Sequence, residues 1–135
     1  MVQIDITYQG GLRCEAVHGP SGTTLVTDAP VDNHGKGESF SPTDLVAAAL
    51  GTCIPTIMGM VAEREKIDLT GMRISVQKEM SAQPPRQIAK LTTRIVMPVG
   101  LTDQQKVKLE KAAHTCPVHQ TLHGNVELPI EFVYP

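Results

Sequence analysis

Apolar and polar residues alternate in several short stretches near both ends of the chain and on either side of residue 80. A period of two is typical of β-strands with one buried face. Pro129 interrupts the last stretch, which indicates an edge position or a bulge, because proline cannot donate a hydrogen bond to the ladder. The pattern predicts strands at residues 4–8, 12–17, 23–27, 72–78, 88–97 and 126–134. The segment 28–40 has no period and is predicted to be a loop.

The longest apolar segment follows Ser41 and predicts a central helix. Ser41 suits the N-cap and Pro42 suits the first helical position, where its missing N–H has no cost. Asp44 completes an S-x-x-D capping pattern and places negative charge at the positive end of the helix dipole. Residues 45–50 are small and apolar on all sides, which is typical of a buried helix. We expect this helix to end near Lys66.

A cysteine lies about three turns into this predicted helix. Cys53 is followed two positions later by Pro55, which should bend the helix because it removes one backbone hydrogen bond. One interpretation makes Cys53 a nucleophilic thiolate inside the protein. The other makes it a small core residue, which is common for a free cysteine.

A second helical region follows the fifth strand. Thr102 and Gln105 form a capping-box signature for a helix that extends to about His114. Cys116 then precedes Pro117, which begins a short helix that Gly124 would end. At the N-cap, free amides and the helix dipole are expected to lower the pKa of the Cys116 thiol.

Composition limits the fold and the function. The order of predicted elements indicates an α+β fold, and 135 residues indicate one domain spanning residues 1–135. A hydrophobic content of 41% excludes disorder, and a net charge of -2 without basic blocks argues against nucleic-acid and membrane-surface partners. The longest apolar run is too short to span a bilayer, and no signal peptide is evident. Three cysteines without an export signal indicate thiol chemistry in the cytoplasm.

Three histidines surround the second cysteine motif. His119 and His123 are one helical turn apart, and Cys116 is able to join them in a zinc site. The alternative is that they are polar residues at an exposed helix end. Because no C-x-x-C pair is present, we predict no metal and no cofactor. Cys14, in a predicted strand, is interpreted as structural.

Two cysteine motifs together resemble the OsmC/Ohr family. They are the segment 41–53, which reads Ser-Pro-Thr-Asp-Leu-Val-Ala-Ala-Ala-Leu-Gly-Thr-Cys, and Cys116-Pro-Val, which begins 63 positions after Cys53. Residues 27–30 and 124–128 are similar to that family too, so the resemblance covers nearly the whole chain. It implies an intertwined homodimer of α+β subunits, each with a curled antiparallel sheet around long central helices.

The resemblance also implies cysteine-based peroxidase chemistry in oxidative-stress defence. Cys53 would be the peroxidatic thiol, which attacks an organic hydroperoxide or hydrogen peroxide and becomes a sulfenic acid. Cys116 would be the resolving thiol, which condenses with it to a redox-active disulfide. An external dithiol would then reduce that disulfide.

Two positions depart from the family pattern. The family often has glutamate directly after the proline that starts the helix, where this chain has Thr43, and Asp44 is the nearest carboxylate. An arginine that holds the peroxidatic thiolate has no clear match, and Arg13, Lys36 and His34 are the candidates. These departures leave open the alternative that the protein is a non-enzymatic member of the OsmC-like group. Such a protein would bind a small apolar or thiol-reactive ligand in the cavity where the peroxide would otherwise react.

Overall fold

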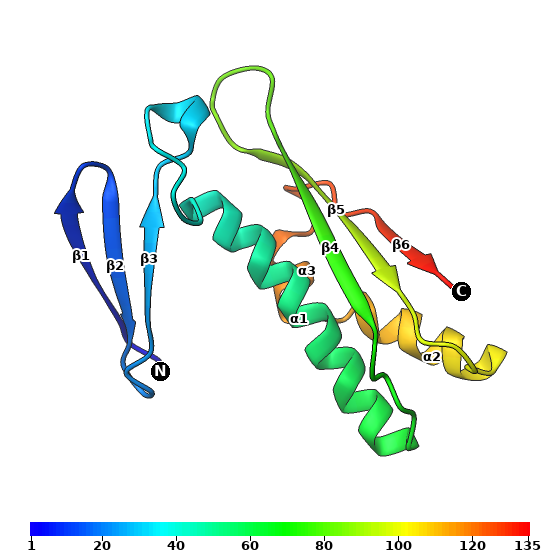
Figure 1. Ribbon diagram of the computed structural model, residues 1–135. Helices are drawn as coiled ribbons and strands as arrows, with labels where there is room; N and C mark the ends of the chain where they lie inside the picture. The colour runs from blue at the N-terminus through cyan, green and yellow to red at the C-terminus, as the bar shows by residue number, and fades with distance from the viewer. The chain divides into compact units, whose positions relative to one another are not determined.

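A computed structural model describes residues 1–135, which form two compact units, Met1–Val46 and Ala47–Pro135. Each unit contains one three-stranded sheet, and the chain has three α-helices (Figure 1). The α+β fold class predicted from the sequence is therefore confirmed. The assignment of residues 1–135 to a single domain stays a prediction.

The first unit is built on an antiparallel sheet with strand order β1-β2-β3. Its strands are β1 (Ile4–Gly10), β2 (Arg13–His18) and β3 (Thr24–Asp28), close to the predicted positions. A tight turn joins β1 to β2, and its Gly10 and Gly11 have φ angles of 82° and 60°. Glycine adopts this left-handed conformation without the strain that a Cβ atom would add.

The loop after β3 contains a short 3₁₀ helix, η1 (Val31–Asn33). The Gly35 N–H donates a hydrogen bond to the Pro30 carbonyl at 2.9 Å. A Cβ atom added at Gly35 would lie 1.7 Å from the carbonyl oxygen of Ala29. The predicted loop is therefore a closely packed turn that has room only for glycine at this position.

Helix α1 (Pro42–Glu65) begins in the first unit with the predicted cap. The Asp44 N–H donates to Ser41 Oγ at 3.1 Å, and the Ser41 N–H donates to Asp44 Oδ2 at 2.9 Å. The helix continues through Pro55 without interruption. By its length and apolar composition alone, α1 meets the criteria for a helix that could cross a membrane. The core helix of a soluble protein meets the same criteria.

The second unit has a sheet with strand order β4-β5-β6. Strands β4 (Arg73–Met80) and β5 (Ile88–Val96) are antiparallel, whereas β6 (Ile130–Val133) pairs with β5 in parallel. The parallel pair differs from the antiparallel sheet that the resemblance implied. It is possible because two helices connect β5 to β6, and parallel neighbours need such a crossover.

Those two helices begin as the sequence predicts. Helix α2 (Asp103–Ala113) has a complete capping box between Thr102 and Gln105, and helix α3 (Pro117–Leu122) has Cys116 at its N-cap. The last strand is shorter than the predicted segment 126–134.

The core of the second unit lies between α1, the sheet and α2. Gly51 brings α1 close to β4, since a Cβ atom there would lie 2.9 Å from Val76 Cγ2. The apolar run 45–50 of α1 is buried or half-buried, as expected, whereas farther along the helix packs through one face and leaves Thr52, Thr56 and Met60 exposed. The buried apolar side chains are Ala47, Leu50, Ile54, Met58 and Ala62 of α1, Leu91 and Ile95 of β5, Met97, and Leu109, Ala112 and Ala113 of α2.

Candidate functional site

Two free cysteines from distant parts of the sequence interact in the second unit. Cys53 comes from α1, and Cys116 is the N-cap residue of α3. The Cys116 side chain is fully buried, and its sulfur accepts a hydrogen bond from the His119 N–H at 3.2 Å. Cys53 lies in helix α1 and not on a loop, as expected, and it is half-buried in the single chain.

The electrostatic environment of Cys116 favours the protonated thiol. Burial raises the pKa of Cys116, and the hydrogen bond and charge of the Cys53 thiol raise it further. The backbone N–H groups of His119 and Val118 act in the opposite direction. The prediction that the N-cap position lowers the pKa of Cys116 is therefore wrong, because the net shift of this pKa is upward. The capping amides are present, but the desolvation of a thiolate outweighs them in a helix of only six residues.

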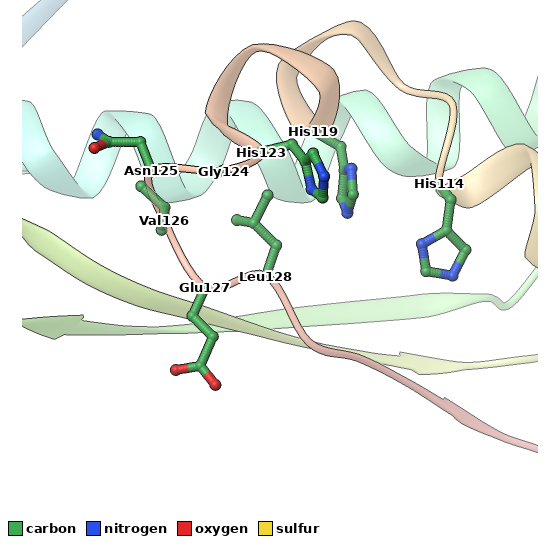
Figure 2. A pocket seen from close by; sticks show the side chains of 8 residues that line it. All are labelled: His114, His119, His123, Gly124, Asn125, Val126, Glu127 and Leu128. Atoms are coloured by element: carbon green, nitrogen blue, oxygen red, sulfur yellow. The ribbon is translucent and has the colours of Figure 1, made fainter.

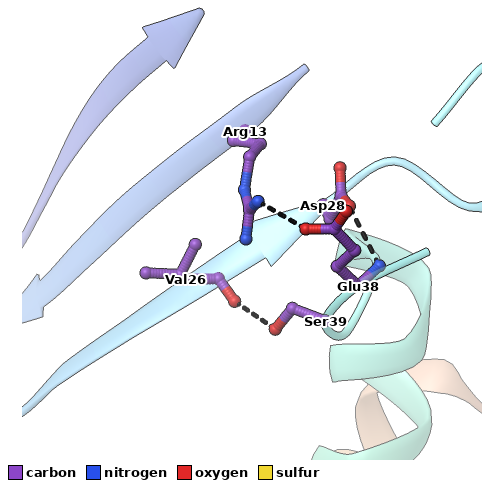
Figure 3. A network of polar contacts seen from close by, with 5 residues as sticks. All are labelled: Arg13, Val26, Asp28, Glu38 and Ser39. Atoms are coloured by element: carbon purple, nitrogen blue, oxygen red, sulfur yellow. Dashed lines mark hydrogen bonds and ion pairs between the residues drawn. The ribbon is translucent and has the colours of Figure 1, made fainter. Parts of the chain in front are cut away.

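Arg13, one of the cations proposed to tune Cys53, makes an ion pair inside the first unit (Figure 3). Its Nη1 lies 3.0 Å from Oε2 of Glu38. The Glu38 N–H donates to Oδ2 of Asp28 at 3.0 Å, and the next residue, Ser39, donates its hydroxyl to the Val26 carbonyl at 2.7 Å. The loop that follows β3 is thus held against the sheet, and the guanidinium of Arg13 is held with it.

The other predicted tuning residues also lie in the first unit. Lys36 is exposed on the loop, and Asp44 is engaged in the cap of α1. Their influence on Cys53, like that of Arg13, stays a prediction. Nothing in the sequence pattern identified Glu38 as the partner of Arg13. Their opposite charges were the only signal, and a separation of 25 positions in the sequence gave no reason to pair them.

A pocket of about 500 Å³ lies in the second unit beside α3 (Figure 2). It is lined by His114, His119, His123, Gly124, Asn125, Val126, Glu127 and Leu128. The sequence analysis considered the histidines as possible ligands, whereas it noted residues 124–128 only for their similarity to the family and not as the wall of a pocket. No group of three His, Cys, Asp or Glu side chains is arranged to hold a metal ion, so the geometry gives no support to a zinc site at Cys116, His119 and His123.

Comparison with known proteins agrees with the fold and the motifs. The model of the family described as OsmC-like protein matches residues 35–131. A structure from Psychrobacter arcticus 273-4, named for osmotic stress induction and a detoxification response, is 39% identical with a TM-score of 0.91, covering 98% of this chain and 96% of that chain. The search of curated proteins gives no match.

Two further structures are named as organic hydroperoxide resistance proteins. The OsmC structure from Legionella pneumophila has 19% identity and a TM-score of 0.79, with 98% of this chain and 96% of that chain covered. OhrB of Bacillus subtilis has 20% identity and a TM-score of 0.72, with 98% and 97% covered. These two share the fold with the present protein. From the family model and the 39% identical relative together, the chain belongs to the OsmC-like protein family.

Proposed function

We propose that this protein is a thiol-dependent reductase of organic hydroperoxides that serves in oxidative-stress defence in the cytoplasm. The observation that carries the proposal is the interaction of two free thiols, Cys53 of α1 and Cys116 at the start of α3. Fold relatives named for organic hydroperoxide resistance support this substrate class. Free thiols that are close together are typical of a reducing compartment.

The reaction divides into three balanced steps. The Cys53 thiolate attacks one oxygen of the peroxide, the O–O bond breaks, and the products are a sulfenic acid on Cys53 and an alkoxide that takes a proton to become the alcohol. The Cys116 sulfur then attacks the Cys53 sulfur, and the hydroxyl leaves as water. A dithiol reductant restores both thiols by two exchange steps and is itself oxidised to a disulfide.

The environments of the two thiols support this division of roles. Cys53 is only half-buried, and a peroxidatic thiol has to be accessible to its substrate. Cys116 is fully buried, and burial keeps its pKa high. A buried neutral thiol is a poor nucleophile, so Cys116 would not compete for peroxide and would react only with a sulfenic acid formed beside it.

A homodimer belongs to the same proposal. Strand β1 exposes Ile4, Ile6 and Tyr8, which are 56%, 67% and 64% exposed as residues. Alternate residues of a strand lie on one face, so these three form an apolar row that a second copy would cover. We expect light scattering to give twice the chain mass, and Ile6→Lys to reduce it to the monomer. A monomeric mass for the unaltered protein would remove this part of the proposal.

The test of the activity is consumption of cumene hydroperoxide with dithiothreitol as the reductant, with hydrogen peroxide as a second substrate. We expect Cys53→Ser to abolish turnover. Cys116→Ser should allow one equivalent of peroxide to react and leave a sulfenic acid that dimedone traps. Cys14→Ser is the matched control, since Cys14 is a free, half-buried thiol on β2 in the other unit and should keep full activity.

Turnover by Cys53→Ser equal to that of the unaltered protein would defeat the proposal. If neither the unaltered protein nor Cys53→Ser turns over peroxide, and both bind a small apolar ligand equally well, the result would instead favour a non-enzymatic binding protein.

A further inference from the structure

One imidazole in the pocket beside α3 is buried with an unsatisfied nitrogen. His119 is only 8% exposed, and its Nδ1 has no hydrogen-bond partner. Buried polar atoms of folded proteins nearly always have a partner, and an orphaned one points to a missing water or ligand. The pocket that His119 lines has a volume of about 500 Å³, which is in the range of small-molecule sites.

The walls of this pocket differ in chemistry. Three imidazole rings come together on one side, with ring centroids 5.6 Å apart for His114 and His119 and 6.0 Å apart for His119 and His123. Val126 and Leu128 contribute aliphatic side chains on the segment that leads to β6 (Figure 2). A neutral imidazole donates one N–H and an imidazolium donates two, so the rings together form a set of donors for an acceptor group.

The donor set favours an anion over a metal cation. No three side chains that ligate metals are placed to hold an ion, and the Glu127 carboxylate points away from the rings (Figure 2). We propose that this pocket binds an aliphatic carboxylate, with the carboxylate at the rings of His114, His119 and His123 and the hydrocarbon chain against Val126 and Leu128. This binding proposal does not require the proposed peroxidase chemistry, although the backbone N–H of His119 is also hydrogen-bonded to the Cys116 sulfur.

The charges around the pocket make binding depend on pH. Burial lowers the pKa of His119, and the nearby His114 and His123 lower it further. A bound carboxylate offsets both effects because its charge stabilises the imidazolium. Glu127, also at the pocket, opposes an anion, but its carboxylate is directed elsewhere. We therefore expect hexanoate to bind more tightly at pH 6 than at pH 8.

Hexanoate is the probe that tests the proposal, added to the full chain under reducing conditions. Binding is measured by calorimetry and by NMR of the histidine Cε1–H groups. Saturable shifts are expected for the three pocket histidines, with His18 of the first unit unchanged as the internal control. His119→Phe keeps a flat aromatic ring and removes both nitrogens, and should weaken binding about tenfold because a charge-assisted hydrogen bond is lost. Cys53→Ser should bind normally.

Two further probes separate the parts of the ligand. Hexanol lacks the charge and inorganic phosphate lacks the chain, so both should bind more weakly than hexanoate. Equal binding of hexanol or of phosphate would overturn the proposal, as would full hexanoate affinity in a folded His119→Phe variant. Leu128→Ala keeps the three rings and should weaken hexanoate but not phosphate, and unchanged hexanoate affinity in this variant would count against the assigned chain position.

Discussion

Gly51 and Gly59 lie in the same helix, but an added methyl group should have opposite effects at the two positions. Within a helix, alanine is more favourable than glycine by about 1 kcal/mol, because glycine loses more backbone entropy on folding. A Cβ atom at Gly59 meets nothing within 4 Å, whereas at Gly51 it would lie 2.9 Å from Val76 Cγ2. We therefore expect Gly59→Ala to stabilise the fold by about 1 kcal/mol.

The effect at Gly51 follows from the distance to β4. Carbon atoms in contact prefer roughly 3.5–4.0 Å, so α1 or β4 must move by about 0.6 Å or more to admit the methyl group. Val76 is β-branched and stiff at χ1, which restricts relief by side-chain rotation. Overpacking of this kind costs about 1–3 kcal/mol. After the gain in helix propensity, Gly51→Ala should be between neutral and about 2 kcal/mol destabilising.

Urea unfolding of the two variants and the unaltered protein measures these differences as shifts of the midpoint at constant slope. The decisive control is Val76→Ala, which removes Cγ2. In that background Gly51→Ala should stabilise about as much as Gly59→Ala does alone, which gives a coupling free energy of about 1–3 kcal/mol between Gly51 and Val76. Equal stabilisation by both glycine substitutions in the natural background would refute the close approach of α1 to β4.

Three other substitutions test features of the fold. Thr93 is fully buried and its Oγ1 has no partner, so Thr93→Val should stabilise the protein by about 1–2 kcal/mol in urea unfolding, since it replaces an unsatisfied hydroxyl by a methyl group. Gly35→Ala should destabilise the loop by several kcal/mol or displace it, because its Cβ would lie 1.7 Å from the Ala29 carbonyl oxygen, and rapid proteolysis after β3 would report this. The pKa of His119 is lowered in the folded protein, so the unfolded chain binds the proton first and stability should fall as pH drops below about 6.5. His119→Phe should make stability depend less on pH in this range. An equally steep fall of stability in the variant would show that the pH dependence does not come from His119.

Local signals in the sequence were sufficient for most of the secondary structure. The cap formed by Ser41 and Asp44 and the capping box of Thr102 and Gln105 lie within four residues of sequence, and both are present in the structure. The alternation along β4 and β5 likewise placed Leu91 on the buried face. In each case the interaction that fixes the element is contained in the element itself.

Features that depend on distant contacts could not be predicted in the same way. The parallel pairing of β6 with β5 depends on how α2 and α3 return the chain, which no local pattern encodes. Some apolar residues of α1 are buried and others are exposed to solvent in the single chain. The composition of the helix alone predicted the same buried environment for all of them. The ion pair between Arg13 and Glu38 joins a strand to a loop that has no period.

The pKa of Cys116 shows how a local signal and a distant one combine at the candidate site. The sequence placed this residue at an N-cap, and the structure agrees, with the His119 N–H directed at the sulfur. Yet the pKa is raised, because the sulfur is fully buried and the Cys53 thiol lies beside it. The burial that raises the pKa also brings the second thiol into reach. In the proposed reaction, Cys116 would therefore be protonated in the reduced protein and would react once oxidation of Cys53 supplies an electrophilic sulfur beside it.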